Sequence, residues 1–408
     1  MEPTLPNLRH LRAFCEVAEH RSITQAAEQV FLSQPAITQA VAKLERQLDS
    51  QLFERLSDGM HPTEAGLLYA QRAGRALGLI RQGCREALKI GADSGNGRQT
   101  SVEQMLTATQ LNALIAVATA RNFSLAAKIV GTSQPALHRS ARDLESLLEI
   151  RLFEKTSQGI ELTRAARVLV QQVKLAYAEL AQGNAEISAL KGINSGLIVV
   201  GSMPLARHGI LPAAINAIAA ELPEVRVSMV AAPYTELLHG LRHGELDLLI
   251  GALRDPLPME DVEQEALFDD PLAIVARSGH PLTAKKRITL NDLAAYPWVV
   301  PQHGTPTRDN FDTLMQGKST AGGLVESSSI VLNISLLLES DRLTLISRQQ
   351  IRREQAQGLV TTLPYDMSGT LRPIGLTTRR NWRPTATQIR FIELLRESAK
   401  RFAAIDTS

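Results

Sequence analysis

The sequence predicts a multi-domain protein with two all-α units, each followed by a long helix, and then a bilobed α/β domain. Three observations support this prediction. The pattern Ser33-Gln34-Pro35-Ala36 returns at Ser133-Gln134-Pro135-Ala136, and the register holds without a gap from Leu11/Leu111 to Ala65/Ala165. After each segment, apolar residues recur at coiled-coil spacing. From Gly196 onward, short buried strands alternate with helices. Two repeats followed by a large unrelated segment exclude a solenoid.

The bulk properties of the chain exclude several classes of protein. Its 408 residues suffice for about two to four domains. Cys15 and Cys84 give neither a disulfide framework nor zinc spacing, and their apolar helical positions predict core or interface residues. The first residues form no apolar h-region, and the sequence has no run of about 18 apolar residues, so we expect a cytoplasmic protein without a membrane span. A net charge of +2 does not by itself indicate nucleic acid.

Each copy reads as a helix-turn-helix with a wing, over residues 1–66 (the first copy) and 106–165 (the second copy). In the first copy, apolar residues from Leu8 to Ala18 predict one helix, and Thr24 is expected to cap a second. Ser33 is expected to cap a third helix that runs to about Leu48, with Pro35 in its first turn. Glycines at 59 and 159 mark the wing turns.

The third helix of each copy is expected to face outward with amides, hydroxyls and guanidinium groups, which suit the major groove of DNA. Arg55 and Lys155, just before the wing turns, are placed to meet a phosphate. The candidate DNA-binding residues are Thr24, Ser33, Gln34, Pro35, Thr38, Gln39, Lys43 and Arg55, and in the second copy Ser133, Gln134, Pro135, His138, Arg139, Arg142 and Lys155. The alternative is a packing module whose polar face is only solvated.

These residues resemble the DNA-binding domain of the LysR-type transcriptional regulators. The resemblance is carried by Ala26-Ala27, Ser33 to Ala36, Leu44-Glu45, Leu52 to Arg55 and Thr63 to Gly66, and again by the equivalent residues of the second copy. Such regulators normally carry one such domain, so the resemblance implies a tandem duplication here. Asp58 and Gln158 stand where the family often has a basic residue before the wing glycine, which argues against wing contacts with DNA.

A long helix is expected after each wing. Residues 67–105 would form the first linker helix and a glycine-rich flexible linker, and residues 166–194 the second linker helix. The second helix carries a heptad seam of Leu169, Val173, Ala176, Leu180, Gly183, Ile187 and Leu190, which predicts pairing with its copy in a partner chain. The seam of the first, from Ala70 to Ala87, has smaller residues and would pair either more closely or more weakly. The resemblance implies a homodimer or homotetramer.

Residues 195–408 are expected to form the bilobed domain, with lobe 1 at about 195–271 and 373–408 and lobe 2 at about 272–372. The elements expected in lobe 1 are a strand at 197–200, a helix at 208–220, a strand at 225–230, a helix at 235–243 and a strand at 246–250. This order predicts a parallel sheet with crossover helices. The domain resembles the type 2 periplasmic binding proteins and the effector domain of the LysR-type regulators.

Ligands of parallel sheets bind beyond the carboxyl ends of the strands. The candidate effector-binding residues are therefore Ser202, Met203, Gln302, His303, Gly304, Thr305, Ser327 and Ser328. Hydroxyls, amides and helix N-termini in this place suit a small polar or anionic ligand; the alternative is a set of ordinary caps and turns. The segment resembles most the family branch that regulates protocatechuate breakdown and a sugar-binding protein, which implies an aromatic-acid metabolite or a sugar.

The sequence contains no nucleophile elbow, P-loop or zinc-protease motif, so we expect no enzyme, no metal and no cofactor. The function predicted is a ligand-responsive transcriptional regulator that binds double-stranded promoter DNA and a small-molecule effector, with RNA polymerase as a further partner. His138, Arg139 and Arg142 favour the second copy as the stronger reader. The alternative is a small-molecule sensor or binding protein whose N-terminal helical domains serve only assembly.

Overall fold

The computed structural model describes residues 5–91, 102–157, 159–193, 196–204, 209–257 and 259–406. The chain divides into two compact units. Residues 1–197 together with 242–245 make one, here the N-terminal unit, and the rest of residues 198–408 makes the other, the C-terminal unit. No helix in the described ranges is both long and apolar enough to cross a membrane.

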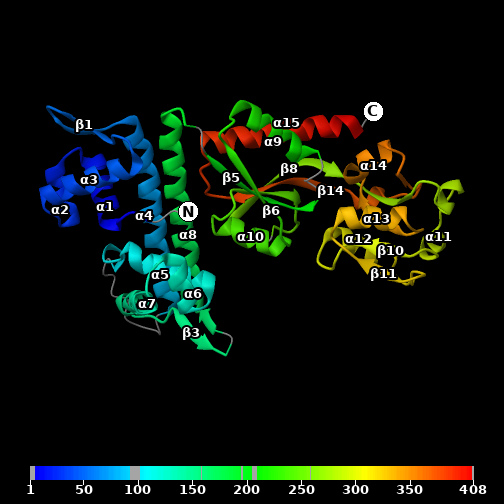
Figure 1. Ribbon diagram of the computed structural model, residues 1–408, viewed down its shortest axis with the longest axis horizontal. Coiled ribbons are helices and arrows are strands. Elements are labelled where there is room, and N and C mark those ends of the chain that lie inside the picture. Colours follow the sequence, from blue (N-terminus) through cyan, green and yellow to red (C-terminus); the bar gives the residue numbers. More distant parts are fainter. Residues whose placement is uncertain are drawn as a thin grey trace. The chain divides into compact units, whose positions relative to one another are not determined.

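The N-terminal unit contains the same series of elements twice, drawn in blue and in cyan to green in Figure 1. The first copy comprises α1 (Leu8–His20), α2 (Ile23–Val30), α3 (Gln34–Leu48), β1 (Phe53–Leu56), β2 (Gly59–Pro62) and the linker helix α4 (Glu64–Gly91). After the short η1 (Val102–Gln104), the second copy comprises α5 (Ala108–Ala120), α6 (Phe123–Val130), α7 (Gln134–Leu148), β3 (Phe153–Thr156), β4 (Gly159–Leu162) and the linker helix α8 (Arg164–Leu190). Each strand pair is an antiparallel wing.

The helix caps follow the sequence with one exception. Ser33 and Ser133 cap α3 and α7 as expected, each accepting a hydrogen bond of 3.4 Å from the backbone N–H three residues later. The prediction that Thr24 caps the second helix is wrong. Ser22 has the extended backbone that a cap needs and accepts from the N–H of Gln25, so α2 begins at Ile23. Thr24 lies in the first turn, where its hydroxyl accepts from the Gln34 amide at 3.1 Å.

The wing turns require glycine in both copies. Gly59 and Gly159 have φ of 139° and 127°, and a Cβ atom at either would lie under 3 Å from the carbonyl oxygen of Arg21 or Arg121. Each of those oxygens accepts a hydrogen bond of 2.9 Å from the residue after the glycine. Each wing is therefore tied to the end of the first helix of its own copy.

The linker helices pair with each other within the chain, antiparallel. Arg72, early in α4, donates to Glu186, late in α8, at 3.0 Å, whereas Gly83 lies against Gln172. The expected seam of α8 is buried in this pair, except for Leu190, which is 43% exposed. The prediction that this seam pairs with its copy in a partner chain is therefore wrong, because the repeat supplies a matching helix in the same chain.

Both copies share one apolar core, to which Cys84 belongs. Cys15 is partly buried and packs against this core, so of the two cysteines Cys84 is the core residue. Burial raises the pKa of both thiols to about 12.

The C-terminal unit contains two mixed five-stranded sheets. The elements of the first sheet and its covering helices are β5 (Leu197–Ser202), α9 (Ile210–Glu221), β6 (Arg226–Val230), α10 (Tyr234–Arg242), β7 (Leu248–Ala252), β8 (Val262–Asp270), β14 (Arg372–Arg379) and α15 (Ala386–Asp406). Those of the second are β9 (Leu272–Arg277), η3 (Pro281–Ala284), α11 (Leu290–Ala294), β10 (Trp298–Val300), α12 (Pro306–Leu314), β11 (Leu324–Glu326), α13 (Ile330–Leu338), β12 (Leu343–Ser347), η4 (Arg348–Ile351), α14 (Arg352–Ala356), β13 (Val360–Thr362) and η5 (Ser368–Thr370).

The sheets are only partly parallel. Strand β5 pairs in parallel with β7, and β10 pairs in parallel with β11 and β12, as the alternation of strands and helices predicts. The strands that lead between the sheets (β8, β9 and β14) pair antiparallel, which the sequence analysis did not anticipate. The chain enters the second sheet at Leu272 and returns to the first at Arg372. The helix expected from His208 begins at Ile210, and His208 itself lies outside the described residues.

Candidate nucleic-acid interface and effector site

Helix α3 separates its side chains as expected. Ile37, Val41 and Leu44 are buried against the rest of the first copy. The exposed residues of the helix include the predicted DNA-contacting set Gln34, Pro35, Thr38, Gln39 and Lys43. Ser33 at the cap and Thr24 on α2 are also exposed and lie beside the first turn of α3. Thr24, Ser33, Gln34 and Pro35 thus lie around one helix N-terminus, where free N–H groups favour a phosphate, and the others continue along the exposed face of α3.

Helix α7 has two arginines among its predicted residues, where α3 has one lysine. Its predicted residues line one shallow concave surface: Gln134, Pro135, His138, Arg139 and Arg142. Two of them have partners within the copy. The His138 ring lies 4.9 Å from the Phe123 ring, and Arg142 makes a 2.6 Å ion pair with Glu145. Arg139 is exposed and has no ion pair with any described residue. It is therefore the side chain most available to a base edge.

One residue in each copy that the sequence analysis noted only as a repeat match positions the wing. Glu45 accepts from the N–H groups of Leu52 and Phe53 at 2.8 and 3.3 Å. Glu145 accepts from the equivalent groups at 2.7 and 3.1 Å. The signal was the exact recurrence of Leu-Glu, but a glutamate next to a buried leucine does not reveal its acceptor role.

The wing strands place Arg55 on β1 and Lys155 on β3, both exposed. Asp58 at the first wing turn is 70% exposed on its side chain and lies 2.9 Å from His61. Its charge at the tip of the first wing repels phosphate, as the sequence suggested. Gln158, at the second wing turn, lies outside the described residues.

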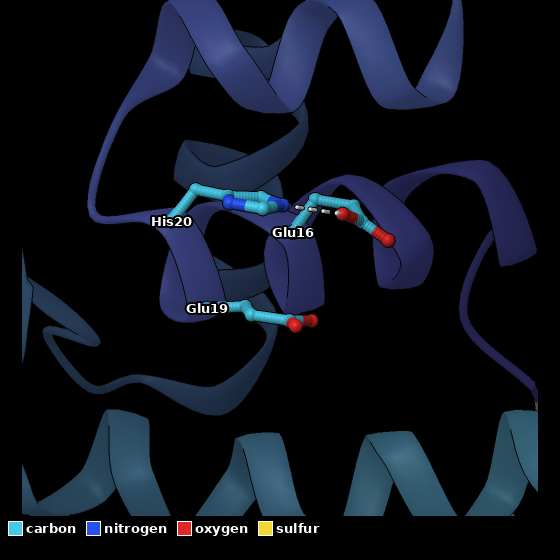
Figure 2. Close-up of side chains that lie close together, drawn as sticks. All are labelled: Glu16, Glu19 and His20. Carbon is cyan, nitrogen blue, oxygen red and sulfur yellow. Dashed lines mark ion pairs between the residues drawn. The ribbon is translucent and has the colours of Figure 1, made fainter.

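Helix α1 also carries three side chains whose ligand atoms lie within 4.8 Å of one another, Glu16, Glu19 and His20. Figure 2 shows the His20 ring directed at Glu16, with which it pairs at 3.4 Å, while the Glu19 carboxylate lies outside that pair. All three are at the surface. Surface acidic groups of this kind occur commonly without a metal, and we assign no metal site here.

The predicted effector residues of the first lobe turn inward. Ser202 is 1% exposed at the end of β5 and donates to the carbonyl of Met203 at 3.3 Å. Met203 packs on Gly251, where a Cβ atom would lie 2.5 Å from the methionine sulfur. Met203 is therefore part of the packing of lobe 1.

The predicted residues of the second lobe precede two helices: residues 302–305 lie before α12, and Ser327 and Ser328 lie before α13. Thr305 caps this helix, accepting from the N–H of Arg308 at 3.2 Å. His303 is exposed, with its ring nitrogens 3.6 and 3.8 Å from two carboxylates. Ser327 is buried and accepts from the N–H of Ser329, the cap of α13. The others, Gln302, Gly304 and Ser328, are exposed. Thr305 and Ser327 thus have the cap and turn roles of the alternative interpretation.

Two charged residues that the sequence analysis missed connect or face the two lobes. Arg372, at the start of β14, donates to Thr307 of α12 at 2.5 Å and to the buried Asp270 at 3.1 Å. Its Nε is buried without a hydrogen-bond partner among the described residues. Arg254 lies 4.6 Å over the ring of Tyr234, within electrostatic reach of Arg372. Burial lowers the pKa of the Arg254 guanidinium.

Comparison with known proteins identifies both halves of the chain. The family described as "Bacterial regulatory helix-turn-helix protein, lysR family" matches residues 8–67 and again residues 108–167, and "LysR substrate binding domain" matches residues 191–400. The transcriptional regulator GalR of Pseudomonas putida is 33% identical over 377 residues, which cover 92% of this chain and 93% of that protein. PcaQ of Agrobacterium fabrum is 28% identical over 73% of this chain and 96% of its own length.

Solved structures show the same fold at lower identity. A full-length OxyR variant from Pseudomonas aeruginosa has a TM-score of 0.52 at 23% identity, covering 72% of this chain and 94% of that one. ArgP from Mycobacterium tuberculosis has a TM-score of 0.55 at 16% identity, covering 71% and 96%. With helix-turn-helix and substrate-binding domains matched, the chain belongs to the LysR family of transcriptional regulators and is not an enzyme.

Proposed function

We propose that this regulator carries a tandem duplication of its DNA-binding domain and that both copies contact promoter DNA. The double family match supports the duplication. PcaQ leaves about a quarter of this chain unmatched, enough for one copy with its linker helix, whereas the alignment with GalR is too long to omit either copy. The observation that carries DNA contact by both copies is the matched pair of helices α3 and α7, each capped by serine and each exposing its predicted polar face.

We further propose that the second copy contributes more affinity. Its exposed face offers Arg139 and Arg142 where the first copy has Gln39 and Ala42. Arginine pairs in bidentate fashion with guanine and also attracts phosphate, whereas glutamine reads adenine without a charge. We also propose that the protein acts in the cytoplasm, with RNA polymerase as a further partner at the promoter.

Fluorescence anisotropy on the promoter DNA upstream of the protein's own gene, at fixed salt, tests this proposal. Thr38→Ala/Gln39→Ala and His138→Ala/Arg139→Ala should both weaken binding, and the second pair more. If only the second pair weakens binding, the first copy is an assembly module. Unchanged binding in both variants would instead support a sensor whose N-terminal helices serve only assembly.

For the effector we propose a small anionic metabolite bound where the lobes meet. Arg254 has no ion pair among the described residues, and the Tyr234 hydroxyl beside it is buried without a hydrogen-bond partner there. A carboxylate would satisfy both groups and would offset the cost of burying the guanidinium. The N-terminus of α12, with the exposed Gln302, Gly304 and Ser328 nearby, would supply further polar contacts.

A thermal-shift screen of aromatic carboxylates and neutral sugars tests the class of effector. Carboxylates should raise the melting temperature of the C-terminal unit, and Arg254→Gln should abolish the shift. Arg287→Gln, which changes an exposed arginine of lobe 2, should leave the shift unchanged. Stabilisation by sugars alone, or a shift that persists in Arg254→Gln, would contradict an anionic effector at this place.

A further inference from the structure

The two copies are related by an approximate twofold axis that lies within one chain. Gly83 of α4 faces Leu169 and Gln172 of α8, and Gly183 of α8 faces Tyr69 and Arg72 of α4. Adding 100 to the residue number on α4 and subtracting 100 from the numbers on α8 converts the first contact into the second. The helix ends follow the same rule to within one residue, since Gly91 lies against Ile150 and Lys191 pairs with Asp49 at 2.9 Å.

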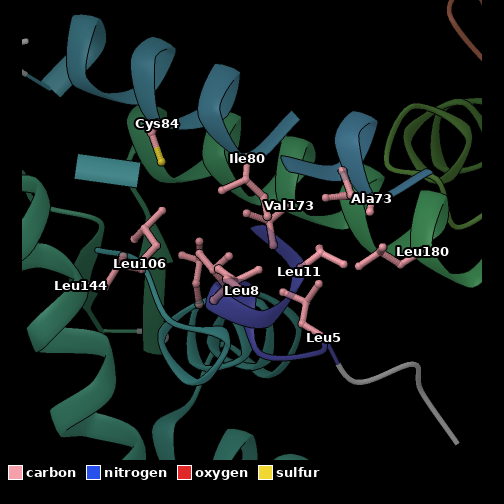
Figure 3. Close-up of a cluster of buried hydrophobic side chains, with 14 of the residues drawn as sticks. Leu5, Leu8, Leu11, Ala73, Ile80, Cys84, Leu106, Leu144, Val173 and Leu180 are labelled. Carbon is pink, nitrogen blue, oxygen red and sulfur yellow. The ribbon is translucent and has the colours of Figure 1, made fainter. Parts of the chain in front are cut away.

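The shared core shows that this pairing is more than a surface contact. Figure 3 shows Leu8 and Leu11 of the first copy in one apolar cluster with Leu144 and Val173 of the second. All four are fully or almost fully buried. Because α4 is 28 residues long, the antiparallel pair extends for about 40 Å. Each copy joins the N-terminal end of its own linker helix. The helices α3 and α7, here called the recognition helices, are therefore carried at opposite ends of the pair.

Charge breaks the symmetry of the helix pair. Arg72 is 5% exposed and bonds to Glu179, Gln182 and Glu186, at 2.9 Å for the first two. Arg75 adds a second guanidinium on Glu179, at 2.7 Å. At the equivalent place on the other side of the axis stands Gln172, whose Oε1 is buried without a partner among the described residues. The cations therefore come from α4 and the buried carboxylates from α8.

This distribution favours α4 with α8 over either helix with its own copy. If α8 paired with α8 in the same register, Glu179 and Glu186 would face Gln172 and Leu175 and would be buried without a cation. If α4 paired with α4, Arg72 would keep Gln82 and Glu86 but would find Leu79 in place of Glu179, and Arg75 would face the same leucine. A buried polar group that is satisfied in one pairing only is a recognised determinant of helix partners.

We propose that one chain presents two unlike recognition helices as a fixed unit, and that its operator contains two unlike sequence elements, one for each copy. The inference rests on the proposed function, because it requires both copies to contact DNA. Between the exposed faces, Thr38 is replaced by His138, Gln39 by Arg139 and Ala42 by Arg142. We expect a guanine-containing element under α7 and an adenine-containing element under α3. However many chains assemble, each contributes this unlike pair.

Selection from random 40-base-pair duplexes with the full-length protein tests this inference. We expect two distinct elements in the selected DNA. Arg139→Ala should lower base discrimination about tenfold in one element only, and Gln39→Ala should do so in the other. Arg46→Ala, an exposed arginine farther along α3, is the control and should leave both base preferences unchanged.

A variant that gains a base preference is a control for misfolding, because a misfolded protein could lose base discrimination but could not acquire a new one. Thr38→His/Gln39→Arg/Ala42→Arg/Lys43→Asp copies the α7 face onto α3, because Asp143 stands at the place of Lys43, and the two selected elements should then become alike. Two like elements selected by the unaltered protein, or two variants that relax the same element, would overturn the inference while leaving DNA binding intact. Absence of salt-dependent binding to the library would overturn the proposed function as well.

Discussion

The first and second copies hold their wings with the same atoms and present different side chains to solvent. Within its own copy, each of Glu45 and Glu145 accepts from the equivalent pair of wing N–H groups. Gly59 and Gly159 each approach the equivalent carbonyl oxygen at the end of the first helix of their copy. On the outward faces of α3 and α7 the copies differ in chemistry, as at Thr38/His138 and Gln39/Arg139. The residues that build the fold are thus retained twice, whereas the residues that would meet DNA have become unlike.

The buried contact between the linker helices likewise combines retained residues with residues that differ between the copies. The glycines that allow close approach, Gly83 and Gly183, are the same in both helices. The side chains that face them, Arg72 and Gln172, are not. A symmetric backbone contact therefore carries an asymmetric charge network, and substitutions at equivalent positions should have unequal effects.

The largest expected effect is at this pair of positions. Arg72→Met leaves buried carboxylates on α8 with less compensation, and we expect it to lower the free energy of opening of α4 and α8 by about 3 kcal/mol. Gln172→Met removes a buried oxygen that has no partner among the described residues, and should change that free energy by under about 1 kcal/mol, towards greater stability. Amide hydrogen exchange of the full-length protein measures both. Equal losses would show that the network does not stabilise the pair.

The next largest effect is expected at Glu45 and Glu145, the glutamates that accept hydrogen bonds from the wings. Glu145→Ala leaves two N–H groups without their acceptor in a buried place and should cost the second wing about 2 kcal/mol. Glu45→Ala should cost less, because Glu45 is only half-buried and water can reach the freed groups. Exchange of the β3–β4 amides, compared with that of β1–β2, measures the difference. A larger loss in the first wing would contradict this ranking.

A third comparison uses the glycines of the linker helices. A Cβ atom at Gly83 would lie 2.8 Å from Cβ of Gln172, and one at Gly183 would lie 3.1 Å from Cβ of Arg72. Gly83→Ala should therefore destabilise the pair by about 1–2 kcal/mol, and Gly183→Ala by less.

Gly74→Ala and Gly78→Ala are matched controls on the same helix, since nothing lies within 4 Å of either added methyl group. Both should stabilise α4 by about 0.5–1 kcal/mol through helix propensity. Destabilisation by the controls, or stabilisation by Gly83→Ala, would show that the close approach of the helices is absent in solution. Hydrogen exchange of α4 and α8 again provides the measurement.

The sequence was sufficient for features that depend on local chemistry or on the repeat. It predicted the caps at Ser33 and Ser133 and the outward faces of α3 and α7, because capping serines and helical periodicity act within a few residues. It could not show that the seam of α8 is filled by α4, because a heptad pattern marks a face without naming its partner. Arg254 and Arg372 were missed for a similar reason, since they meet α12 only through the fold.

The smallest expected effect lies in the turn before each recognition helix. Phe31 has φ of 52° and is 87% exposed, whereas the equivalent Gly131 has φ of 71°, where glycine is favoured. Phe31→Gly should stabilise the end of α2 by up to about 1 kcal/mol, reduced by the greater freedom of glycine in the unfolded chain.

Gly131→Phe should have the opposite sign in the second copy, and the cost should come from the backbone alone because nothing lies within 4 Å of an added Cβ there. Exchange of the α2 and α6 amides measures the two changes. If Phe31→Gly stabilises the turn but weakens DNA binding, the exposed ring contributes to the interface, and the unlikeness of the two copies extends beyond their recognition helices. If it stabilises the turn and leaves binding unchanged, the difference between the copies is confined to the outward faces of α3 and α7.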